Sequence, residues 1–85
     1  MKVKNIKNRL LEYFPTDKVE VFDLRNSGDH FSIIIISDKF INTSLVDRHR
    51  YIYSIFKNEI THSIHALQIQ TFTYDEWKSK KRHIT

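Results

Sequence analysis

The chain has 85 residues, of which 40% are hydrophobic and 13% aromatic, and this composition suits one small domain with a modest core. A single glycine and a single proline exclude collagen and Gly/Pro-rich disorder, and the lack of cysteine excludes disulfides and thiolate ligands from this chain. The net charge of +4 suits a solvated surface, although basic termini could also attract a nucleic acid or another acidic partner.

Membrane-spanning and secretory segments are not expected. The longest aliphatic run is Ile33–Ile36, far short of the ~20 residues that a membrane helix needs. Residues 1–5 lack the apolar stretch of a signal peptide. We therefore expect residues 1–85 to form one soluble cytoplasmic domain that does not bind membranes and is monomeric when isolated.

The first predicted element is an amphipathic helix. Val3, Ile6, Leu10 and Phe14 recur at steps of three and four, which places them on one helical face. Pro15 ends the helix, because proline has no amide hydrogen and disfavours helical geometry in the preceding residue.

Two strands joined by a short loop are predicted next. Apolar and polar residues alternate from Lys18 to about Leu24, and a second strand is expected over His30–Ser37. The loop 25–29 contains the only glycine, Gly28, which can adopt a positive φ. The short connection predicts an antiparallel hairpin, and the β-branched run in the second strand predicts a central position in the sheet.

A second helix is predicted from an N-cap at Ser44 to about residue 58 or 59. Its apolar face is expected to contain Leu45, His49, Ile52 and Phe56. Arg48 and Arg50 are expected largely on other faces.

The chain is predicted to finish with a strand over Leu67–Phe72 and a short helix. A strand–helix–strand crossover favours parallel pairing of the second and third strands. Thr73 and Glu76 form a capping-box pattern that opens the last helix, with Trp77 as its anchor. Residues 78–85 are expected to fray into a basic tail. The order is helix–strand–strand–helix–strand–helix, an α+β fold with a three-stranded mixed sheet.

Several stretches in this order resemble the BolA-like proteins. The resemblance covers nearly the whole chain and implies a fold like the class II KH domain. It also implies a monothiol glutaredoxin partner, with a 2Fe–2S cluster shared between the two proteins in iron–sulfur trafficking or iron sensing. Bacterial relatives are described as stress-linked transcriptional regulators. The matching stretches are 19–21, Gly28-Asp29-His30-Phe31, 36–40, Leu45-Val46-Asp47-Arg48-His49-Arg50, 64–67, 71–73 and Glu76-Trp77.

Histidines are the candidate metal ligands. His65 matches the family's histidine before alanine, which carries the cluster-ligand role, whereas the residue alone would also fit a partly buried packing role. His30 is a second candidate, since neighbouring parallel strands would bring it near His65. Some relatives place cysteine or histidine where this chain has Ser27, a poor iron ligand. Ser27, Gly28 and Asp29 are expected to form the partner-docking loop.

Nucleic-acid binding is the alternative function. It would use Arg48 and Arg50 with the tail residues Lys78, Lys80, Lys81 and Arg82. The two arginines are two positions apart, so they diverge around the helix, and His49 is expected to pack. A Gly-x-x-Gly loop, which KH domains use to hold nucleic acid, cannot exist with one glycine. Asn42 stands where relatives often have glycine, and asparagine tolerates left-handed geometry.

The sequence therefore predicts a non-enzymatic adaptor. Catalytic signatures such as a Walker loop or His-Glu-x-x-His are missing. The spacing His62-x-x-His65 can bind a metal ion on a helix, but here it spans a predicted helix end and strand start, so the two rings need not face each other. A 2Fe–2S cluster needs four ligands, so glutaredoxin and glutathione would supply the thiolates. The alternatives are a DNA-binding regulator and an interaction module without metal.

Overall fold

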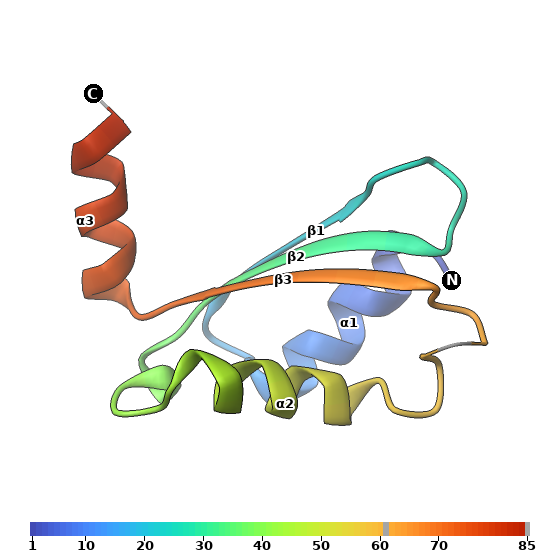
Figure 1. The fold of residues 1–85 in the computed structure, drawn as a ribbon, viewed down its shortest axis with the longest axis horizontal. Coiled ribbons are helices and arrows are strands. Elements are labelled where there is room, and N and C mark those ends of the chain that lie inside the picture. Colours follow the sequence, from blue (N-terminus) through green and yellow to red (C-terminus); the bar gives the residue numbers. More distant parts are fainter. Residues whose placement is uncertain (61, 85) are drawn as a thin grey trace.

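The computed structural model describes residues 1–60 and 62–84, with the backbone alone from residue 81 onward. None of the helices in these ranges is long and apolar enough to cross a membrane. The elements, shown in Figure 1, are α1 (Val3–Tyr13), β1 (Lys18–Asp23), β2 (His30–Ile36), the 3-10 helix η1 (Asp38–Phe40), α2 (Leu45–Ile55), β3 (Ala66–Phe72) and α3 (Tyr74–Ile84).

The three strands form one mixed sheet in the order β1-β2-β3. β1 pairs with β2 antiparallel and β2 pairs with β3 parallel, as the sequence predicts. Helices α1 and α2 lie on one side of the sheet, and α3 projects to the other side (Figure 1). Because β2 and β3 are parallel, both begin at the same end of the sheet, where His30 is paired with Ala66.

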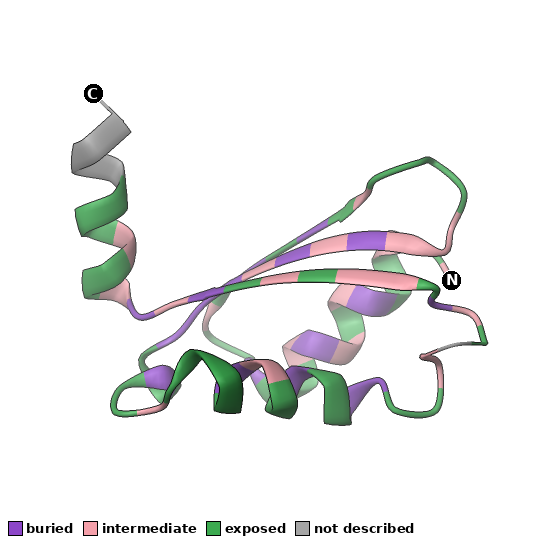
Figure 2. Cartoon of the chain, viewed as in Figure 1, coloured by how far each residue is buried: buried purple, intermediate pink, exposed green. Residues whose placement is uncertain are grey.

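The core lies between the sheet and the two helices α1 and α2. Alternate strand residues point toward the helices, because successive side chains in a strand face opposite sides. Figure 2 shows this alternation as buried and more exposed bands along each strand. The core includes Ile6, Leu10, Phe14, Val19, Val21, Phe31, Ile33, Ile35, Phe40, Ile52, Ile55, Phe56 and Ile64.

The predicted helix starts are confirmed by their hydrogen bonds. The Ser44 hydroxyl accepts from the Asp47 amide at 3.1 Å, which caps α2. The Thr73 hydroxyl accepts from the Glu76 amide at 3.1 Å, and a Glu76 carboxylate oxygen accepts from the Thr73 amide at 2.7 Å. This capping box fixes the start of α3. Asn42 adopts the expected left-handed geometry, with φ of 62°.

The structure differs from three expectations about the helices. Ile52 and Phe56 are buried as predicted, together with Arg48 and Ile55 of α2, whereas Leu45 is 63% exposed and His49 is only partly buried. The second helix ends at Ile55, earlier than predicted. Helix α3 continues to Ile84, where the sequence predicts fraying from residue 78.

Candidate functional site

Asp29, His30 and His65 meet at the end of the sheet where β2 and β3 begin. The backbone amides of His65 and Ala66 donate to the Asp29 carbonyl at 2.8 and 3.2 Å. These bonds extend the parallel register one residue beyond the strands, so they fix the segment before β3 against the β1–β2 loop. The expected convergence of His30 and His65 is therefore present.

The Asp29 carboxylate lies between the two imidazole rings. His30 Nδ1 is 2.7 Å from Asp29 Oδ1, and His65 Nδ1 is 3.2 Å from Asp29 Oδ2. The ring centroids of the two histidines are 6.2 Å apart, and their planes are perpendicular. The side chain of His65 is 55% exposed and that of His30 is 20% exposed, so His65 is the more accessible ring.

This arrangement leaves the outer nitrogen of each ring available. A carboxylate at Nδ1 favours the tautomer that carries its hydrogen on Nδ1, which puts the lone pair on Nε2. Neither Nε2 makes a hydrogen bond to a residue in the described part of the chain. Histidine ligands of metals generally have their other nitrogen held in this way by a carboxylate or a carbonyl. Asp29 can therefore orient the His30 ring through a hydrogen bond, while the His65 ring lies at ion-pair distance from the same carboxylate.

Asp29 itself is held as a carboxylate. The Ser27 hydroxyl donates to Asp29 Oδ1, and this bond, with the contact to His30, lowers the pKa of Asp29 from 3.8 to about 2. Ser27 thus supports Asp29 and is not placed as a ligand. In the described residues, no group of three or more His, Asp or Glu side chains is arranged to hold a metal ion alone.

The lowered pKa predicts an acid-dependent loss of stability. A carboxyl whose pKa is lower in the folded state stabilises the protein above the unfolded value, and this contribution disappears as the pH falls. For Asp29 the loss should occur between about pH 4 and pH 2. The difference in unfolding free energy between wild type and Asp29→Asn should therefore shrink across this interval, as measured by urea denaturation at stepped pH. A difference in unfolding free energy that stays constant down to pH 2 would contradict the stabilising role assigned to the Asp29 carboxylate.

The loop before Asp29 is built around the Asp23 carboxylate. Asp23 Oδ1 accepts from the Ser27 amide at 3.2 Å, and Oδ2 accepts from the Gly28 amide at 2.8 Å. The N-terminal amine of Met1 donates to the Gly28 carbonyl at 2.8 Å. Gly28 has φ of 77°, which confirms the positive φ expected of the only glycine. The loop is thus tied to both the end of β1 and the N-terminus.

Gly28→Ala should destabilise the protein by ~1–2 kcal/mol. The positive φ strains an L residue, and the new Cβ would lie 3.0 Å from the Met1 carbonyl oxygen. Thermal unfolding checks this prediction, with Arg25→Ala as a control in the same loop, because the Arg25 side chain is exposed and its backbone has no positive φ. A loss no larger than that of Arg25→Ala would show that the loop accommodates a side chain at position 28.

A shallow depression of about 120 Å³ borders His65. It is lined by Tyr53 of α2, by Ile60 and Ile64 of the following turns, and by Ala66 and Leu67 of β3. The Tyr53 hydroxyl donates to the Leu67 carbonyl at 3.2 Å, which joins α2 to the start of β3. His62, three residues before His65, is exposed and makes no contact with the histidine pair. A partner protein that contacts His65 could therefore also pack against this apolar depression.

Arg48 is not available to contact phosphates, which corrects the expectation that α2 presents it outward. The residue is 5% exposed, and its Nε donates to the Thr43 carbonyl at 2.9 Å. Its Nη2 donates to the Phe40 carbonyl at 3.0 Å. Both terminal nitrogens also bind the Glu76 carboxylate, at 2.8 and 3.2 Å. Arg48 therefore ties η1, α2 and α3 together.

The other cations proposed for nucleic-acid binding remain accessible where they are described. Arg50 is 78% exposed and lies 3.7 Å from Asp47. Lys78 and Lys80 are exposed on α3, and the Lys80 ammonium lies 4.8 Å from the centre of the Phe72 ring. The side chains of Lys81 and Arg82 lie outside the described residues. Arg50 and the α3 lysines project from different elements.

Two functional features were missed in the sequence. Sequence patterns place Asp29 only in a docking loop, although its position directly before His30 at a strand start indicates a carboxylate beside a histidine. The pair Arg48–Glu76 was missed because the two residues are 28 positions apart. The sequence indicates Glu76 only as a capping residue, whereas in the structure it both caps α3 and binds Arg48.

Comparisons with known proteins agree with this architecture. The sequence model of one family, described as BolA-like protein, matches residues 14–76. An uncharacterized protein of Buchnera aphidicola is 36% identical, with 95% of this chain and 85% of the relative covered. The DNA-binding transcriptional regulator BolA of Haemophilus influenzae is 42% identical over 71% of this chain and 58% of its own length, so the chain spans little more than half of that regulator.

Solved structures show the same fold. The BolA domain of SufE1 from Arabidopsis thaliana superposes with a TM-score of 0.79 at 32% identity, covering 87% of this chain and 93% of that domain. Yeast Fra2 superposes with a TM-score of 0.73 at 28% identity, covering 91% of this chain and 84% of Fra2. The family match over most of the chain and these shared folds agree with the predicted α+β architecture. The chain belongs to the BolA-like protein family.

Proposed function

We propose that this chain is a non-enzymatic adaptor that binds a monothiol glutaredoxin and contributes His65, with His30, to a shared 2Fe–2S cluster. The observation that carries the proposal is the pair of imidazoles with both Nδ1 atoms facing the Asp29 carboxylate. The site lies at an exposed end of the sheet, beside the loop of Ser27, Gly28 and Asp29. That loop and the depression beside His65 would form the docking surface.

The ligand chemistry fits a cluster that is shared and not held by this chain alone. A 2Fe–2S cluster has four protein or thiol ligands, and two histidines can occupy one iron, as in Rieske centres. This chain has no cysteine, so the glutaredoxin cysteine and glutathione would supply the thiolates. Nitrogen ligands in place of thiolates raise the reduction potential of such a cluster. The role of this chain is to present, orient and partly cover the two rings.

The proposal is tested by comparing glutaredoxin with and without its cluster. Isothermal titration should give tighter binding of the chain to the cluster-loaded glutaredoxin than to the apo form, because the histidines bind only when iron is present. Equal affinity for both forms would favour an interaction module without metal. Absence of binding to either form would reject the glutaredoxin proposal.

DNA binding is the second candidate, because relatives from Haemophilus influenzae and Escherichia coli are named DNA-binding transcriptional regulators. In this chain it would rely on Arg50, Lys78 and Lys80, and not on the buried Arg48. Each phosphate contact releases counterions, so the affinity should fall steeply with salt. A salt titration with Arg50→Gln and Lys78→Gln, each against wild type, tests this function. If the dependence of DNA affinity on salt concentration were unchanged in both variants, Arg50 and Lys78 would not be the phosphate contacts.

A further inference from the structure

The outer face of α2 carries a regular stripe of apolar and basic side chains, which we call the α2 stripe. The stripe continues beyond Ile55 through the following turns, in which the Ile60 amide donates to the Phe56 carbonyl at 3.0 Å. Its members are spaced by four, three, four and three positions, so they share one side of the helix within an arc of about 80°. They are Val46, Arg50, Tyr53, Lys57 and Ile60.

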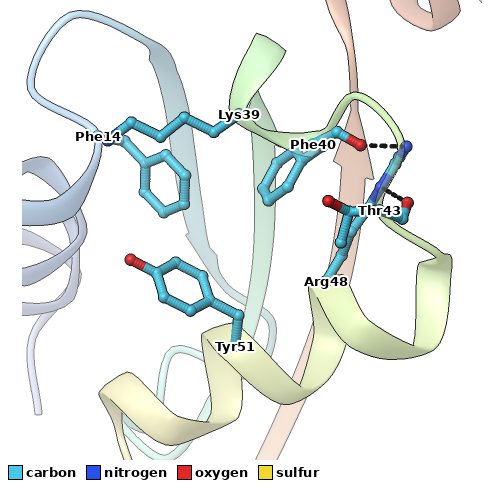
Figure 3. A pocket seen from close by; sticks show the side chains of 6 residues that line it. All are labelled: Phe14, Lys39, Phe40, Thr43, Arg48 and Tyr51. Carbon is cyan, nitrogen blue, oxygen red and sulfur yellow. Dashed lines mark hydrogen bonds between the residues drawn. The ribbon is translucent and has the colours of Figure 1, made fainter.

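The opposite face of α2 has its partners within the chain. Arg48, Ile52 and Ile55 are buried there. Figure 3 shows the Arg48 side chain with its hydrogen bonds to the carbonyls of Phe40 and Thr43. Most of the α2 stripe faces solvent instead, and Figure 2 shows the exposed bands along this helix.

The apolar members of the α2 stripe are well exposed for residues of their type. Val46 is 58% exposed and Tyr53 is 41% exposed, while Ile60 is partly buried. The Tyr53 hydroxyl donates to the Leu67 carbonyl at 3.2 Å, which fixes the position of its ring. Neighbouring exposed apolar side chains with charged residues beside them mark protein interaction sites. Tyr53 and Ile60 also line the depression beside His65, so the stripe reaches the edge of that site.

The charge on the α2 stripe is positive. Arg50 and Lys57 line a shallow groove of about 570 Å³, and the described residues that line it include no acidic side chain. The Arg50 side chain is 78% exposed, and its ion pair with Asp47 is 3.7 Å long and open to water. Lys57 makes no ion pair with a residue that the structure describes. Exposed pairs of this kind are weak, so both cations can bind carboxylates of another molecule.

The spacing of the α2 stripe favours a helix as the partner. Alternating steps of four and three positions give a period of about 3.5 residues, with which two helices pack along each other. A helix that carries acidic and apolar residues at the same spacing would place a carboxylate beside each cation and an apolar side chain on each apolar member. A DNA backbone would satisfy Arg50 and Lys57 but would leave the apolar members uncovered.

We propose that the α2 stripe is the docking surface for an acidic amphipathic helix of a partner protein. The carboxylates of that helix pair with Arg50 and Lys57, and its apolar side chains cover the three apolar members of the stripe. The surface uses neither His30 nor His65 as a ligand, so it binds the helix whether or not the chain binds a glutaredoxin. Because the helix occupies Arg50, it competes with DNA.

Two synthetic peptides of about 18 residues, a length at which alanine-rich helices form in water, test the proposal by two-dimensional NMR. One peptide carries leucine, glutamate, leucine, glutamate and leucine at steps of four, three, four and three positions. The other has glutamine in place of both glutamates. The glutamate peptide should shift the signals of Val46, Tyr53 and Ile60. It should bind wild type about tenfold more tightly than the glutamine peptide, which is the effect of two ion pairs.

The combined variant Arg50→Gln and Lys57→Gln should lose this tenfold preference. Its affinity for the glutamine peptide should equal that of wild type, which also shows that the variant surface is folded. The matched control combines Lys4→Gln with Lys18→Gln, which removes two exposed cations outside the groove. The control should keep the preference, because it changes the net charge by the same amount and leaves the α2 stripe intact.

Several outcomes would overturn the proposal. Equal binding of the two peptides by wild type, or a preference that survives in the combined variant, would exclude Arg50 and Lys57 as the carboxylate partners. A preference that the control also loses would attribute it to net charge. If millimolar peptide left the signals of Val46, Tyr53 and Ile60 unshifted, the α2 stripe would not be a helix-docking surface. If a short DNA duplex bound these residues more tightly than the glutamate peptide, the surface would belong to nucleic acid.

Discussion

Arg48→Ala is expected to lower the unfolding free energy by ~3 kcal/mol, because removing one partner of a buried ion pair leaves the other groups without compensation. Arg48 is 5% exposed and donates to the carbonyls of Phe40 and Thr43 as well as to Glu76. Those carbonyls would lose their donors, and α3 would lose its ionic link to α2. The value stands at the lower end of the range for buried pairs because the Glu76 side chain is 47% exposed and partly screened by water.

Arg50→Ala is the matched control for this prediction. It removes the same side chain two positions away, where the guanidinium is 78% exposed and 3.7 Å from Asp47. Its effect should stay within ~0.5 kcal/mol. Urea denaturation at neutral pH measures both variants. Equal losses in the two variants would contradict the structural role assigned to Arg48.

The Arg48–Glu76 pair should also make the stability of the protein depend on pH. Hydrogen bonds from Arg48 lower the pKa of Glu76 below its ordinary value of 4.5, so its stabilising contribution is complete above that pH and is lost as the pH falls. Acidification should therefore narrow the difference in stability between wild type and Glu76→Gln. Denaturation curves at neutral pH and at successively lower pH below 4.5 measure this difference in unfolding free energy. A difference that widens on acidification would contradict the prediction.

His65→Ala is expected to lower the affinity for cluster-loaded glutaredoxin by at least ~100-fold and to leave the affinity for the apo form unchanged. The reason is that His65 is the more exposed of the two rings and the one that the proposal makes a ligand. Asp29→Asn should cost ~10-fold or more, because loss of the orienting group typically weakens metal binding by this amount. Isothermal titration against both forms of glutaredoxin gives these ratios.

His62→Ala is the control for the ligand assignment. His62 is exposed and lies outside the Asp29–His30–His65 contacts, so its removal should leave both affinities at wild-type values. A loss in His62→Ala equal to that in His65→Ala would show that the effect comes from general disturbance of the turn before β3.

Much of the fold follows from local sequence patterns. Pro15 limits α1, alternation marks β1 and β3, and Thr73 with Glu76 marks the start of α3, because each signal acts within a few residues. The parallel pairing of β2 and β3 followed from the intervening helix, and it correctly predicted that His30 and His65 approach each other.

The burial of Arg48 could not be predicted from periodicity. A pattern that counts arginine as polar rotates the apparent apolar face of α2 toward Leu45 and His49, which the structure leaves exposed or only partly buried. Arg48 is buried only because Glu76, Phe40 and Thr43 meet it from three other segments. The bridging position of Asp29 likewise depends on the register between β2 and β3, which fixes the distance between two segments far apart in sequence.

Visible circular dichroism of cluster-loaded monothiol glutaredoxin, titrated with wild type, His65→Ala and His62→Ala, tests the adaptor proposal most directly. The cluster signal reports its ligands, so it separates ligation from docking. Wild type and His62→Ala should change the spectrum with saturation at one equivalent, and His65→Ala should not. An unchanged spectrum with wild type, or the same change with His65→Ala, would contradict the assignment of His65 to the cluster.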